Sequence, residues 1–147
     1  MAKKPRTQHE KAMTGNAGLN YAGWQLSRRG WHVMPTIRNA RGSDLFVTND
    51  DESVFLGIQS KALDGHAAVK LGQSLEALRS DFWIITVKAN SDAPTCYVLS
   101  LDDVKRGASR DKGGEQAFWL ERRDYEKEEF REAWDRMTLV NGTPQHL

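Results

Sequence analysis

Residues 41–62 read RGSDLFVTNDDESVFLGIQSKA and constrain the architecture of this chain more than any other stretch. Apolar residues lie on both sides of its middle part, TNDDES, which is a polar turn of hairpin length. The pattern predicts two antiparallel strands, over 44–48 and 53–62, at the centre of a sheet. Their alternating Leu, Val and Ile side chains would form one buried face, because such residues prefer a core.

Polar residues interrupt this hairpin at one level. Successive side chains on a strand point to opposite faces, so Gln59 and Lys61 share a face, and the turn brings Asp44 to within a residue or two of the level of Gln59. We expect the three side chains to cluster at one end of the sheet, facing the first helix. Alone, Asp44 would be a strand-entry residue and Lys61 a solvated strand-end lysine. Together they suit a divalent cation and a phosphate, since hard cations bind carboxylate and amide oxygens.

The rest of the chain predicts an α/β fold, a single-domain mixed β-sheet flanked by helices. Pro35 indicates that the first strand is an edge strand or bends near its end. The glycines at 18 and 23 allow another backbone to approach the first helix closely. The expected elements are a helix over 14–29, a strand over 31–37, the central hairpin, a loop and helix over 63–80, strands over 82–88 and 95–101, a short helix from 102, a short strand over 117–120, and an amphipathic helix over 124–137 that buries Tyr125, Phe130, Trp134 and Met137.

Composition fits one domain with a genuine core. The chain has 147 residues, of which 39% are hydrophobic, and its mean hydropathy of −0.65 argues against a membrane protein. The basic start has no apolar stretch behind it, so it is not a secretory signal. The lone Cys96 lies in an apolar strand pattern and predicts a buried core thiol in a reducing compartment, which fits the cytoplasm.

Charge is unevenly divided along the chain. Residues 1–43 hold eight Lys or Arg and one acid, a net of +7, and the remainder holds thirteen bases and nineteen acids, a net of −6. A basic first third that ends beside Asp44 favours a polyanion-facing side. The competing interpretation is a solvated tail with ordinary helix-end arginines.

An acid, a hairpin and then Gln-x-Lys resemble the signature of the PD-(D/E)XK nuclease superfamily, in the variant with Gln in place of the second acid. The surroundings are similar as well: GNAG at 15–18 leads into a helix, WHV at 31–33 begins a strand, and DFWII at 81–85 resembles a later strand of small bacterial and phage proteins of this type. The resemblance implies a restriction-endonuclease-like αβββαβ core over 14–107. A flexible basic arm (1–13) would precede it, and a C-terminal loop and amphipathic helix (108–147) would pack on it.

The resemblance implies a metal-dependent DNA endonuclease that hydrolyses phosphodiester bonds. Asp44 and Gln59 would hold Mg²⁺, with Mn²⁺ as an alternative, and Lys61 would position water and phosphate. DNA would be the partner, and a chain of this size would act as a homodimer or with a targeting protein. The residues expected to grip DNA phosphates are Arg28, Arg29, Arg38, Arg41 and Lys70.

One departure from the family keeps a second function open. Many relatives carry a metal-holding Glu in the first helix, where this chain has Leu19 and Asn20. With Gln59 also neutral, Asp44 is the one firm carboxylate, and Gln25 on the same helix is a candidate to point toward the site. The alternative is a catalytically eroded module that binds DNA or a protein partner.

Overall fold

The computed structural model describes residues 4–37, 42–111, 116–140 and 143–144. The elements in chain order are α1 Gln8–Ser27, β1 His32–Pro35, β2 Leu45–Thr48, β3 Phe55–Ala62, β4 Val69–Gly72, the 3-10 helix η2 Leu75–Ala77, β5 Phe82–Val87, β6 Thr95–Ser100, α2 Leu101–Gly107, β7 Ser109–Arg110, β8 Phe118–Leu120, α3 Arg122–Tyr125, the 3-10 helix η3 Trp134–Thr138, β9 Leu139–Val140 and β10 Thr143–Pro144.

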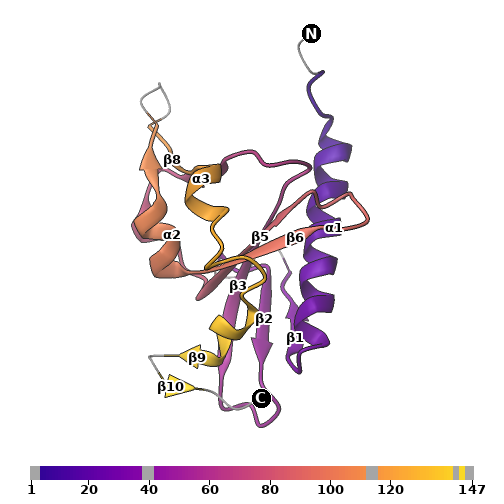
Figure 1. The fold of residues 1–147 in the computed structure, drawn as a ribbon, viewed down its shortest axis with the longest axis vertical. Helices are drawn as coiled ribbons and strands as arrows, with labels where there is room; N and C mark the ends of the chain where they lie inside the picture. The colour runs from indigo at the N-terminus through magenta and orange to yellow at the C-terminus, as the bar shows by residue number, and fades with distance from the viewer. Residues whose placement is uncertain (1–3, 38–41, 112–115, 141–142, 145–147) are drawn as a thin grey trace.

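A five-stranded mixed sheet in the order β1-β2-β3-β5-β6 organises the molecule. All neighbouring pairs in it are antiparallel except β3 and β5, which run parallel. A smaller sheet in the order β4-β8-β7 lies beside it. Figure 1 shows α1 along one side of the molecule, with α2 and α3 on the other. The predicted mixed sheet flanked by helices is therefore confirmed, with β1 as the predicted edge strand.

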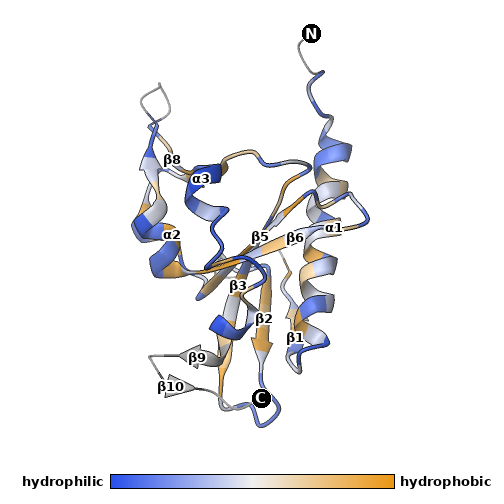
Figure 2. Cartoon of the chain, in the orientation of Figure 1, coloured by the Kyte–Doolittle hydropathy of each residue, from blue (hydrophilic) through white to orange (hydrophobic). Residues whose placement is uncertain are grey.

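Side-chain alternation divides the core into two clusters, one on each face of the large sheet. One cluster joins α1, through Ala22 and Leu26, to the sheet through Leu45, Ile58 and Ile84, and it includes Cys96 as predicted. The other cluster lies on the opposite face and carries the smaller sheet, α2 and α3. Figure 2 shows the apolar strands between more hydrophilic helices. Among the described residues, no helix is both long enough and apolar enough to cross a membrane.

Helix α1 approaches the sheet most closely at Gly18, as its sequence predicted. A β-carbon built on Gly18 would lie 2.2 Å from the Cβ atom of Ala62 on β3, far inside van der Waals contact. Gly15 lies one turn earlier on the same helix and would meet nothing within 4 Å. Gly18 is thus required by packing, whereas Gly15 is not.

We expect Gly18→Ala to destabilise the protein and Gly15→Ala to stabilise it. The first substitution forces a methyl group into filled space, which costs about 1–3 kcal/mol. The second removes backbone entropy from the unfolded chain at an open helical position and contributes about 0.5–1 kcal/mol. Urea unfolding of both variants measures the difference. Adding Ala62→Gly to Gly18→Ala should recover part of the loss, and equal stability of the two single variants would contradict the close contact.

The first helix and the crossover from β3 to β5 differ from their predictions. Helix α1 begins earlier than predicted, at Gln8, because the Thr7 side chain caps it by accepting a hydrogen bond from the Glu10 amide at 3.1 Å. Residues 8–13, assigned to the basic arm, therefore belong to the helix. The crossover from β3 to β5 was predicted to carry a helix, and it carries β4 and the single 3-10 turn η2 instead.

The predicted amphipathic helix over 124–137 is wrong, although its four apolar residues are all buried as expected. The helix α3 ends at Tyr125, and the chain then follows the edge of the sheet along β6. The amide of Val98 donates to the Phe130 carbonyl at 2.8 Å, and the Glu132 amide donates to the Cys96 carbonyl at 2.8 Å. These bonds satisfy backbone groups that an exposed edge strand would leave unpaired, which a helix could not do.

Candidate functional site

Asp44 is held firmly at the entrance of β2. Its amide donates to the Ile58 carbonyl at 2.8 Å, and its own carbonyl accepts from the Thr36 amide at 2.9 Å. The carboxylate Oδ2 accepts from the Ser60 amide at 2.8 Å. Since Leu45 pairs with Ile58 in the antiparallel ladder, Asp44 lies opposite Gln59. The hairpin had predicted this proximity to within a residue or two.

Gln59 and Lys61 lie two residues apart on β3 and share the face on which Asp44 lies. Gln59 is 9% exposed, yet its amide makes no hydrogen bond within the described part of the chain. Lys61 is half-buried, and its Nζ atom lies 5.9 Å from the centroid of the Trp83 ring. Burial lowers the pKa of Lys61, and the nearby Asp44 carboxylate partly offsets that effect. The structure therefore brings the three predicted side chains together.

The expected orientation of this cluster is wrong. Helix α1 packs on the face that carries Leu45, Ile58 and Ile84, and Gln59 points to the opposite face by strand alternation. Gln25 does not approach the cluster either, because its side chain bonds to Tyr21 in its own helix and to Arg29 just after the helix end. The hairpin determines that the three site residues share one face of the sheet, but it does not indicate which face the helix covers.

An open hollow of about 420 Å³ lies over this cluster. Its base consists of Gln59, Lys61 and Trp83, and Lys70 of β4 and Arg79, which precedes β5, line its sides. The full lining is Gly42, Gln59, Lys61, Lys70, Leu71, Gly72, Ala77, Leu78, Arg79 and Trp83. Three of these side chains are cationic and none is a carboxylate, so the hollow favours an anion.

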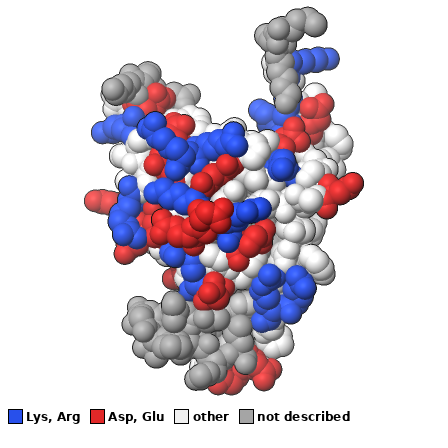
Figure 3. All heavy atoms as spheres, in the orientation of Figure 1, with Lys and Arg blue, Asp and Glu red and all other residues white. Residues whose placement is uncertain are grey.

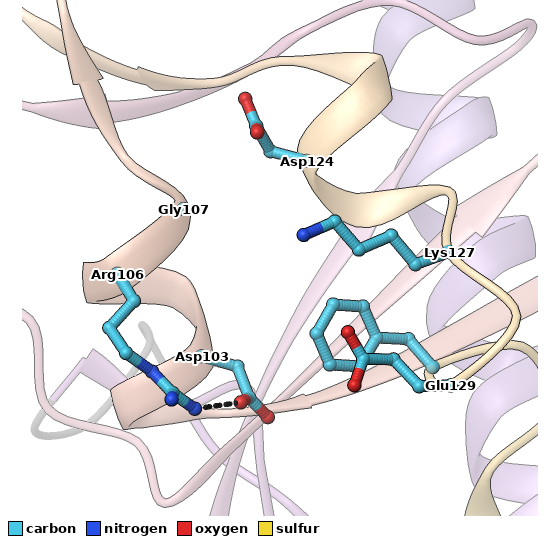
Figure 4. Close-up of a pocket in the computed structure, with 7 residues that line it drawn as sticks. Asp103, Arg106, Gly107, Asp124, Lys127 and Glu129 are labelled. Carbon is cyan, nitrogen blue, oxygen red and sulfur yellow. Dashed lines mark hydrogen bonds and ion pairs between the residues drawn. The ribbon is translucent and has the colours of Figure 1, made fainter.

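A second hollow, between α2 and α3, has the opposite character (Figure 4). There the acids Asp103, Asp124 and Glu129 lie among bases, and Asp103 pairs with Arg106 at 2.7 Å. Burial would raise the pKa of Asp103, but hydrogen bonds from Ser100 and the neighbouring arginines outweigh it and lower that pKa. This pocket is neutralised internally, which distinguishes it from the hollow above Lys61.

The residues predicted to grip a polyanion fall in different places. Lys70 lines the hollow, whereas Arg28 and Arg29 lie at the end of α1 and stack over Trp24 and Trp134, at 5.1 Å and 5.0 Å from the ring centroids. Figure 3 shows Lys and Arg gathered near that helix end, and acids and bases intermingled over α2 and α3. Arg38 and Arg41 lie outside the described residues.

Sequence reasoning missed Arg79, which was assigned to a helix. A β-carbon on Gly42 would lie 3.9 Å from the Cβ atom of Arg79, so this arginine borders the loop that leads into Asp44. The feature of the sequence that could have identified Arg79 is the strand β5 that follows it. Because β5 pairs in parallel with β3, the residues just before β5 lie beside the loop that enters β2.

The donor atoms available for a metal ion are few. The described residues contain no group of three or more His, Cys, Asp or Glu side chains that could hold one. Asp81, the acid next to β5, accepts a hydrogen bond from the Gly57 amide at 2.8 Å. Asp44 and Gln59 remain, with one carboxylate and one amide oxygen. This set fits Mg²⁺, which commonly keeps several waters and binds through one or two carboxylates together with substrate phosphate.

No protein-family model and no curated protein matches this chain. Among solved structures, the bacterial homing endonuclease I-Ssp6803I superimposes with a TM-score of 0.56 at 19% sequence identity. The match covers 86% of this chain and 89% of the endonuclease. At this identity the likeness concerns the fold, and the chain has the α/β fold of that nuclease.

Proposed function

We propose that this protein is a metal-dependent DNA endonuclease of the PD-(D/E)XK type, with Asp44, Gln59 and Lys61 as its catalytic residues. One observation carries the proposal: the three side chains share one sheet face, and two of them, Gln59 and Lys61, line a cationic hollow. Structural similarity to a homing endonuclease supports a nuclease at the level of the fold. A phosphodiester is the anion that this combination of groups is suited to hydrolyse.

Each residue would have a separate task. Asp44 and Gln59 would hold Mg²⁺ or Mn²⁺, which when bound lowers the pKa of water and neutralises phosphate oxygens. The Ser60 amide would keep the Asp44 carboxylate in one orientation. Lys61 would hold the attacking water or stabilise charge that develops on the phosphate, in a site where surrounding protein strengthens that interaction.

The environment of Lys61 agrees with such a task. Burial lowers the pKa of its ammonium, with Asp44 acting against this effect. Lys61 forms no ion pair with any of the described residues, so its half-buried charge destabilises the free protein, and an anion in the hollow would offset that cost. Perturbed pKa values of this origin are frequent at functional sites.

Gln59→Glu tests the metal ligands most directly. A second carboxylate beside Asp44 should tighten binding of Mg²⁺ or Mn²⁺, because a charged ligand attracts the cation more strongly than a neutral amide. Calorimetric titration of each metal into the wild type and the variant measures the change. Gln8→Glu is the matched control, since Gln8 is exposed at the start of α1 and should leave metal affinity unchanged.

The accompanying activity measurement is nicking or cleavage of DNA. It should require Mg²⁺ or Mn²⁺, disappear with chelator and, in Gln59→Glu, begin at a lower metal concentration. If neither the wild type nor Gln59→Glu binds a divalent metal at millimolar concentrations, the nuclease proposal fails.

A second candidate function is a binding module with the same fold and an eroded site. The observation that favours it is the lack of a carboxylate at the expected place on α1: Leu19 and Asn20 stand where many members of the superfamily have Glu, and α1 lies on the opposite face of the sheet. Such a module would bind DNA with equal affinity in chelator and in Mg²⁺, and it would leave the DNA intact.

A further inference from the structure

The cationic hollow extends well beyond the three proposed catalytic residues. Its sides are formed by β4, by η2 and by the segment before β5, which together supply Lys70 and Arg79. A volume of about 420 Å³ lies within the range of roughly 300–1,000 Å³ that is typical of ligand sites. The hollow therefore has room for more than the scissile phosphate.

The irregular pairing of β4 with β8 helps to place Lys70 in the lining of the hollow. A β-bulge interrupts the pairing of β4 with β8 between Lys70 and Gly72, and bulges commonly redirect side chains. Leu71 at the bulge is buried in the core, while Lys70 is exposed and its Nζ atom lies 5.8 Å from the centroid of the Trp119 ring. Gly72, which also lines the hollow, has a φ of +90°, and a β-carbon built on it would meet nothing within 4 Å.

Arg79 also lines the hollow, next to Gly42, and its side chain is exposed. It forms no ion pair with any described residue. Gln59, between the two cations at the base, is nine-tenths buried, and its amide has no hydrogen-bond partner within the described residues. The lining of the hollow thus combines three cations with a buried amide and includes no carboxylate, a composition that favours an anion.

We infer that this hollow binds a second phosphodiester group of the DNA strand, next to the scissile one, and that Lys70 and Arg79 hold it. This inference rests on the proposed nuclease function. Arg79 suits the role because its planar guanidinium matches two phosphate oxygens at once, whereas the Lys70 ammonium acts as a point charge. The two residues would fix the position of the strand over Asp44 and Lys61 without taking part in bond cleavage.

The test measures binding of a fluorescein-labelled DNA duplex by anisotropy, in chelator and over a series of KCl concentrations. Each phosphate contact contributes about 0.9 to the slope of log K against log [salt]. Lys70→Ala and Arg79→Ala should each reduce that slope by about 1, and the double variant by about 2. Lys105→Ala and Arg123→Ala, from α2 and α3 outside the hollow, are the matched controls and should keep the wild-type slope. An unchanged slope in the double variant, or an equal reduction in the controls, would overturn the inference.

Cleavage kinetics separate this inference from the proposed function. Arg79→Ala should raise KM and leave kcat nearly unchanged, because a remote phosphate contact is made equally in the ground state and the transition state. If the Lys70 and Arg79 variants have a reduced salt slope but the wild type does not cleave DNA, the hollow remains a DNA-binding site and the nuclease proposal is rejected. If the double variant cleaves DNA with the slope and KM of the wild type, the nuclease proposal stands and only the inference about the hollow is rejected.

Discussion

Lys61→Met is expected to abolish DNA cleavage and at the same time to stabilise the protein. Removing a group that stabilises charge in the transition state costs about 10²–10³-fold in kcat. Stability should rise by about 0.5–2 kcal/mol, as is common when a strained functional group is replaced by a neutral one. Burial is the reason, since it lowers the pKa of Lys61 and makes the charged form costly in the folded state. Methionine has a similar length and carries no charge.

The pH dependence of stability gives an independent check. Burial holds the folded-state pKa of Lys61 below the ordinary value for a lysine. The cost of the buried charge is therefore fully present below the folded pKa, and it disappears as the pH rises from there toward the unfolded value. Thermal unfolding should show the advantage of Lys61→Met at neutral pH and its decline at alkaline pH. Lys11→Met, at an exposed position of α1, should show neither effect. A Lys61→Met variant that still cleaves would remove Lys61 from the mechanism.

Strand alternation and hairpin length were enough to predict the grouping of the site. Both are local properties of the chain: side chains on a strand alternate with a period of two, and a short turn fixes the register. Asp44 consequently lies opposite Gln59 without any information about the rest of the fold. The same local rules do not say which face a helix covers, so the orientation toward α1 was wrong.

Non-local pairing explains what the sequence did not predict. The buried residues of the C-terminal segment, such as Tyr125 and Trp134, follow a spacing close to that of a helix. The decisive interaction is instead the bonding of Phe130 to Val98 on the edge strand β6, which links residues far apart in the chain. Strand β4 was missed for a related reason, because its partner β8 follows long after it. The resulting hollow depends on both β4 and β5, so Arg79 could not be recognised from its neighbours.

Replacing Asp44 in two ways should separate its charge from its hydrogen bond. Asp44→Asn keeps an oxygen that can accept from the Ser60 amide but loses the charge that would hold a metal ion. Asp44→Ala loses both. We expect each variant to cleave DNA at least about 10²-fold more slowly, because a metal bound through a single carboxylate depends on it for the chemistry. Their stabilities should differ, since only Asp44→Ala leaves the Ser60 amide, now bonded at 2.8 Å, without its partner, at a cost of about 1–3 kcal/mol.

Three measurements on the same two proteins decide among the roles of Asp44. Urea unfolding should place Asp44→Asn near the wild type and Asp44→Ala clearly below it. Calorimetric titration should find little divalent metal bound to either variant, and cleavage assays should find both inactive. Because the carboxylate also raises the pKa of Lys61, that pKa should fall further in both variants. Full cleavage by Asp44→Asn would mean that an amide at position 44 is enough for catalysis and that the role of the carboxylate is to stabilise the fold. Loss of cleavage with normal metal binding would instead place the essential charge in the pairing of Asp44 with Lys61.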